Sequence, residues 1–120
     1  MRTGDKRTCR VTVRAFIKAT GEYEDVTAWT RSPDALFAVH RALLTFDIKG
    51  PWVVSHRATG LKINLLAFTT REAALAAADR LAATGLFENV AFSAKRGVRF
   101  PGGLRKRAIA AIKELHAEAA

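Results

Sequence analysis

Residues 52–83, WVVSHRATGLKINLLAFTTREAALAAADRLAA, contain two strand patterns followed by one helix pattern. Apolar and polar side chains alternate along 61–68, which is the two-residue period of a strand with one buried face. Thr59-Gly60 supplies a turn ahead of this strand, and the alanine-rich run 73–83 strongly favours a helix. The stretch therefore predicts a β-hairpin followed by a helix, which we call a ββα unit.

A similar pattern precedes this unit. Segments 10–18 and 23–30 have strand character on either side of Thr20-Gly21. Ser32-Pro33-Asp34 is typical of a helix start, because it offers a capping hydroxyl, a proline and an acid. Apolar residues then recur at spacings of three and four, at Leu36, Val39 and Leu43. A shift of 39 residues superimposes the two patterns, turn on turn and helix on helix, which indicates a repeated unit.

These patterns predict an α+β fold in a single domain, residues 1–120. Tandem ββα units, about 10–47 and 50–84, would share a four- to five-stranded antiparallel sheet with two helices on one face. Residues 90–92 would add a short strand, and residues 94–120 would form a basic glycine-rich loop and a C-terminal helix. The two units would pair within one chain or across a homodimer.

The charge of the chain departs from the average, with 20 Lys and Arg against 11 Asp and Glu and a net charge of +9. Residues 1–18 sum to +5 and residues 95–107 to +6, while the remainder sums to −2. A concentrated positive field attracts polyanions, so these two segments predict a nucleic-acid partner or an acidic protein surface. The alternative is that both segments are solvated charge that raises solubility.

Candidate nucleic-acid contacts come from both basic segments and from the end of the strand at 52–56. If helices cover the face that holds Val11 and Val13, the alternate side chains of that strand project from the opposite face. Phe16 would then offer a ring for base stacking, or alternatively pack beneath the C-terminal helix. Three cations in the first turn of that helix are unfavourable unless an anion binds there, close to Gly102-Gly103. The candidates are Arg10, Arg14, Phe16, Lys18, His56, Arg57, Lys95, Arg96, Arg99, Arg105, Lys106 and Arg107.

Catalytic and metal-binding motifs are missing from the sequence. Cys9 is the only cysteine, which excludes an internal disulfide and a thiolate-rich zinc site. The three histidines lack metal-ligand spacing, and no nucleophile or phosphate-loop motif occurs. His56 is the most site-like single residue, although its apolar neighbours indicate equally that it flanks the core. We therefore expect no catalytic residue, no metal, no cofactor and no enzymatic activity.

Membrane association is not expected either. No uncharged apolar run approaches the roughly 20 residues that cross a bilayer. Residues 1–10 are polar and basic, without the apolar region of a secretory signal. We expect a cytoplasmic protein that makes no contact with a membrane.

Three functional hypotheses fit these observations. The first is a non-enzymatic DNA- or RNA-binding protein that contacts phosphates through its first strand and residues 95–107. The second is a small protein-binding inhibitor or adaptor, encoded by a phage or plasmid, that acts on a nucleic-acid-processing complex. The third is a structural component of a ribonucleoprotein or virion, in which assembly would cover the basic segments.

Overall fold

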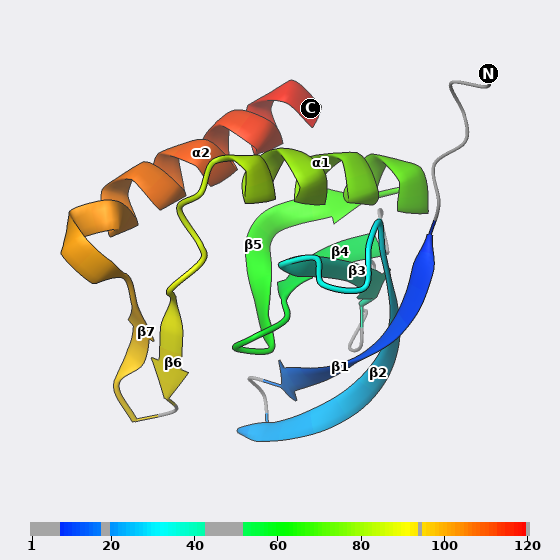
Figure 1. Cartoon of the computed structure of the whole chain (residues 1–120), viewed down its shortest axis with the longest axis horizontal. Coiled ribbons are helices and arrows are strands. Elements are labelled where there is room, and N and C mark those ends of the chain that lie inside the picture. The colour runs from blue at the N-terminus through cyan, green and yellow to red at the C-terminus, as the bar shows by residue number, and fades with distance from the viewer. Residues whose placement is uncertain (1–7, 18–19, 43–51, 94, 120) are drawn as a thin grey trace.

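The computed structural model describes residues 8–17, 20–42, 52–93 and 95–119. Five strands form one antiparallel sheet in sequence order (Figure 1). They are β1 (Cys9–Ile17), β2 (Glu22–Thr30), β3 (Phe37–Arg41), β4 (Trp52–His56) and β5 (Leu61–Phe68). The other elements are α1 (Arg71–Ala83), the hairpin of β6 (Ala91–Ser93) and β7 (Gly97–Arg99), the 3-10 turn η1 (Pro101–Gly103), and α2 (Leu104–Ala119). The described chain is therefore α+β with an antiparallel sheet, as the sequence predicts.

The helix predicted after Ser32 is wrong where the structure describes it. Residues 37–41 form β3, the middle strand of the sheet, which pairs with β2 and along its whole length with β4. Four consecutive residues of β3 are buried, at Phe37, Ala38, Val39 and His40. Such burial suits a strand that is covered on both faces, whereas a surface helix buries a single stripe. The remainder of this predicted helix, residues 43–47, lies outside the described residues.

The tandem ββα arrangement is consequently not confirmed. One unit, β4–β5–α1, has the predicted order of elements, but the other region contributes three strands to the sheet. The glycine-rich loop predicted for residues 94–103 also differs, because residues 97–99 pair with 91–93 in a separate two-stranded sheet. The predicted C-terminal helix is confirmed as α2.

The main core lies between the sheet and the two helices. Phe37 and Val39 of β3 and Val54 of β4 pack against the buried face of α1, which includes Leu75 and Leu81. Helix α2 contributes buried side chains to the same core, so both helices cover one face of the sheet (Figure 1). Burying large apolar side chains in this layer is the dominant stabilising contribution to the fold.

A smaller core lies on the other face of the sheet and is built from Val13, Ala28 and Ala38. The β1–β2 hairpin curls, so that β1 reaches the turn between β4 and β5 (Figure 1). There Phe16 N donates to Gly60 O over 2.8 Å. Gly60 has φ of +77°, and a Cβ at this position would lie 2.2 Å from Arg14 O, so only glycine permits this approach.

The register of β1 corrects the expectation about its faces. Arg10 is opposite Trp29, and Trp29 is opposite Val39, so these three residues share the face that the helices cover elsewhere. Val11 and Val13 belong to the smaller core on the other face. The helices therefore do not cover the Val11 and Val13 face. Arg10 is exposed because it lies on the edge strand.

Candidate functional site

An aromatic contact joins the first strand, β1, to the β6–β7 hairpin. The rings of Phe16 in β1 and Phe92 in β6 meet edge to face, with centroids 5.0 Å apart. Phe16 also contacts Tyr23 of β2 at 5.2 Å. Phe16 is thus half-buried beneath the β6–β7 hairpin, rather than beneath α2 or open for base stacking. The exposed ring of this cluster is Tyr23, at 40%.

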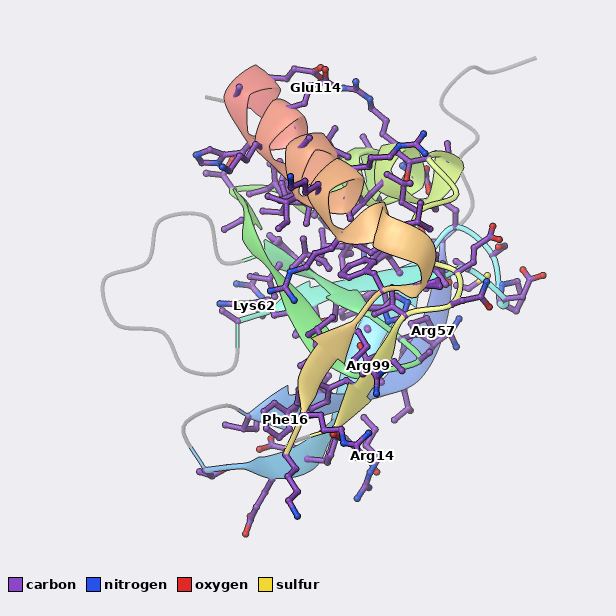
Figure 2. All side chains as sticks on the ribbon, turned by 90° about the vertical axis from the view of Figure 1, so that its left-hand side faces the viewer. Arg14, Phe16, Arg57, Lys62, Arg99 and Glu114 are labelled. Carbon is purple, nitrogen blue, oxygen red and sulfur yellow. The ribbon has the colours of Figure 1, made fainter. Side chains whose placement is uncertain are left out.

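The aromatic contact places basic residues from both segments on one side of the molecule. Figure 2 shows Arg14 of β1 and Arg99 of β7 along the same side. Lys95 and Arg96 are exposed in the turn between β6 and β7. The guanidinium carbon of Arg14 lies 5.4 Å from the centre of the Tyr23 ring. We call the surface made by Arg14, Tyr23, Lys95, Arg96 and Arg99 the basic face.

Arg14 of the basic face has an ion-pair partner in Asp25. Asp25 is opposite Arg14 in the β1–β2 register, and their side chains are 3.8 Å apart with both groups largely exposed. An exposed ion pair of this kind contributes at most about 1 kcal/mol and is screened by salt. Arg14 can therefore exchange this partner for a phosphate at little cost.

Two of the predicted nucleic-acid contacts, His56 and Arg57, form hydrogen bonds with other residues of the chain. His56 is 2% exposed, and its Nε2–H donates to Phe87 O at 2.9 Å. Its Nδ1 is 2.9 Å from Thr59 Oγ1 and accepts from that hydroxyl in the neutral ring. Burial lowers the pKa of His56 and favours this neutral form. Arg57 Nη1 donates to two carbonyls of the 33–35 loop, at 2.8 and 3.0 Å.

The remaining candidates lie outside the basic face. Arg10 is exposed at the opposite end of β1 from Phe16, four residues or roughly 13 Å from Arg14 along the strand. Lys18 lies outside the described residues. Arg105, Lys106 and Arg107 are exposed in the first turn of α2, which contains no acid. The structure thus brings Arg14 together with the hairpin cations and leaves Arg10 apart.

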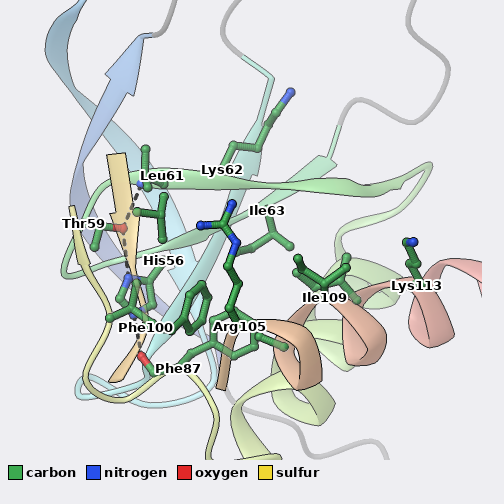
Figure 3. Close-up of a pocket in the computed structure, with 14 residues that line it drawn as sticks. His56, Thr59, Leu61, Lys62, Ile63, Phe87, Phe100, Arg105, Ile109 and Lys113 are labelled. Atoms are coloured by element: carbon green, nitrogen blue, oxygen red, sulfur yellow. Dashed lines mark hydrogen bonds between the residues drawn. The ribbon is translucent and has the colours of Figure 1, made fainter. Parts of the chain in front are cut away.

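A cavity of about 340 Å³ lies between α2, β5 and the β6–β7 hairpin (Figure 3). Its lining includes three cationic residues, Lys62, Arg105 and Lys113, of which the sequence indicated only Arg105. Tyr23 was also missed. Pairing residues outward from the Thr20-Gly21 turn would have placed Tyr23 opposite Phe16. The spacing of four residues between Arg105, Ile109 and Lys113 would have placed these three side chains on one side of α2.

No cluster of three or more His, Cys, Asp or Glu side chains suited to a metal ion occurs among the residues that the structure describes. No helix in the described ranges combines the length and apolarity needed to span a bilayer. Comparison with protein-family models, curated proteins and solved structures finds no match for this chain. Its function must therefore be inferred from the chemistry of its own residues.

Proposed function

We propose that this protein binds nucleic acid, without catalysing a reaction on it, through the basic face. The observation that carries the proposal is the contact between Phe16 and Phe92, which joins Arg14 to the cations of the β6–β7 hairpin. Backbone phosphates account for most of the affinity of such surfaces, because binding releases their counterions. Lys106 and Arg107 are exposed in the first turn of α2, which follows β7 and η1 in the chain, and they add positive charge.

The exposed ring of Tyr23 adds a second component of binding. An aromatic side chain beside cations is the arrangement on which unpaired bases stack, typically for about 1–3 kcal/mol per base. Paired bases in a duplex do not present their faces to a protein surface. A single-stranded ligand would therefore use both the cations and the ring, whereas a duplex would use the cations alone.

The salt dependence of binding tests the proposal. If Arg14, the three hairpin cations, Lys106 and Arg107 each contact a phosphate, the log–log slope of affinity against salt is about −5 for a duplex. Removing Lys95 and Arg96 together should reduce the magnitude of this slope by about two. A slope near zero for the unmodified protein would refute phosphate binding.

A charge-matched control separates the basic face from general charge. The variant Arg41→Ala with Lys113→Ala removes two exposed cations that lie outside the basic face. Its affinity should stay closer to that of the unmodified protein than the affinity of Lys95→Ala with Arg96→Ala. Equal losses would mean that net charge, and not this surface, determines binding. The substitution Tyr23→Ala should weaken binding to a single-stranded oligonucleotide more than to a duplex of the same length.

A further inference from the structure

The cavity between α2, β5 and the β6–β7 hairpin has an apolar lining. Side chains from four parts of the chain meet there, and Ile109 of α2 is 41% exposed at this surface. An exposed apolar hollow of this volume is at the lower end of the range for ligand pockets. The main apolar contributors are Ile63, Phe87, Val98, Phe100, Ile109 and Ile112.

The uncharged polar side chains in the lining, His56 and Thr59, already have partners. His56 bonds to Phe87 O and to Thr59 Oγ1, and the Thr59 hydroxyl oxygen also accepts from Leu61 N at 3.3 Å. A nucleobase or a peptide buried here would leave its own donors and acceptors unpaired, which is unfavourable. The lining therefore favours a ligand whose buried part is a hydrocarbon chain.

Positive charge lies at the mouth of the cavity. Arg105 extends from the first turn of α2 across the cavity toward β5 (Figure 3). Lys113 is eight residues further along the same helix, about 12 Å at 1.5 Å per residue. The described lining residues include no acid, and no ion pair found among the described residues involves Arg105 or Lys113. An anionic group at the mouth would therefore find a free guanidinium.

We propose that this cavity binds a small amphiphilic anion, with an aliphatic chain in the apolar hollow and a carboxylate on Arg105. A guanidinium matches the geometry of a carboxylate and donates two parallel hydrogen bonds to it. This inference does not depend on nucleic-acid binding, because the lining contains none of the basic-face residues.

Titration calorimetry with decanoate tests the assignment. Decanoate should bind in a one-to-one complex, and decanol, which has the same chain without the charge, should bind at least about tenfold more weakly because it lacks the charge-assisted bonds. Adenosine monophosphate, which carries an anion on a polar body, should not displace decanoate from the cavity. Equal binding of decanol would overturn the role of Arg105, and displacement of decanoate by the nucleotide would overturn the hydrocarbon assignment. Absence of decanoate binding would overturn the whole proposal.

Paired variants locate the binding site. Arg105→Ala should weaken decanoate binding about tenfold. Arg107→Ala removes the same charge two residues away, outside the cavity lining, and should change binding less than about twofold. Ile109→Glu places an acid at the mouth and should abolish binding, whereas Ala110→Glu, at the next and exposed position, should not. Equal effects within either pair would show that decanoate binds elsewhere.

Discussion

Replacing Gly60 by alanine should destabilise the protein far more than the same change at Gly21. Both glycines have left-handed backbones, with φ of +77° and +75°. A Cβ on Gly60 would lie 2.2 Å from Arg14 O and 3.2 Å from Tyr23 Cε1, whereas one on Gly21 meets nothing within 4 Å. The two positions therefore differ in their surroundings and share their backbone conformation, which makes Gly21 the matched control.

The magnitude follows from three contributions. The left-handed conformation costs an alanine about 1–2 kcal/mol at either position. At Gly60 the overlap with Arg14 O adds about 1–3 kcal/mol, as for other overpacked sites. Moving the strands apart weakens the bond from Phe16 N to Gly60 O, worth about 1 kcal/mol. The expected loss is about 3–6 kcal/mol for Gly60→Ala and about 1–2 kcal/mol for Gly21→Ala.

Urea unfolding followed by circular dichroism measures this difference. Against a total stability of about 5–15 kcal/mol, Gly60→Ala should leave a barely folded protein, with a midpoint well below that of Gly21→Ala. Equal destabilisation by the two substitutions would contradict the reasoning, because it would mean that β1 does not approach the β4–β5 turn in solution. An unchanged m value in Gly21→Ala would confirm that the control keeps its fold.

Three further outcomes are expected. Burial lowers the pKa of both His40 and His56 below the ordinary 6.5, so the unfolded chain takes up protons first as pH falls. The free energy of unfolding should thus be highest above about pH 7. Below pH 6.5 it should decline by at most about 1.4 kcal/mol per pH unit for each histidine. A free energy of unfolding in urea that stays constant from pH 7.5 to 5.5 would contradict this. Phe92→Ala removes the ring contact with β1, so amide hydrogen exchange of residues 91–99 should accelerate; unchanged exchange would mean that other contacts hold the hairpin. Arg57→Ala should cost about 1–3 kcal/mol of stability, because it leaves two carbonyls without their donor. The salt dependence of nucleic-acid binding should not change. A smaller slope of affinity against salt would mean that Arg57 belongs to the binding surface.

Local patterns in the sequence were sufficient for the two hairpins and for α1 and α2. Alternating side chains predicted β1 and the first half of β5, where exposed residues separate buried ones. β4 is buried from Val53 to His56 and was located by its apolar run and by the turn at Thr59-Gly60 that follows it. The shift of 39 residues also matched Gly21 with Gly60, and both have the left-handed backbone that a turn requires. The repeat thus corresponds to a shared turn geometry even though the tandem ββα arrangement is not confirmed.

The middle strand β3 could not be predicted from the same patterns. A strand that is buried on both faces lacks alternation, so its apolar residues also fit the spacing of a helix. Phe37 and Val39 face α1, while Ala38 faces the smaller core. The residues that cover these two faces of β3 come from distant parts of the chain. The preceding Ser32-Pro33-Asp34 forms a turn, in which Ala35 N donates to Ser32 O, and does not begin a helix. The outcome here depends on tertiary packing rather than local preference.

The candidate site shows the same division between local and distant information. Charge sums located the basic segments, but only the ring contact between Phe16 of β1 and Phe92 of β6 determines which of their cations lie together. The first turn of α2 shows why counting charge is insufficient. Arg105 lies over the apolar cavity, whereas Lys106 and Arg107 do not line it. Substituting all three residues at once would therefore disturb two surfaces of different chemistry. Single variants are required to distinguish a site for an amphiphilic anion from a surface for phosphates.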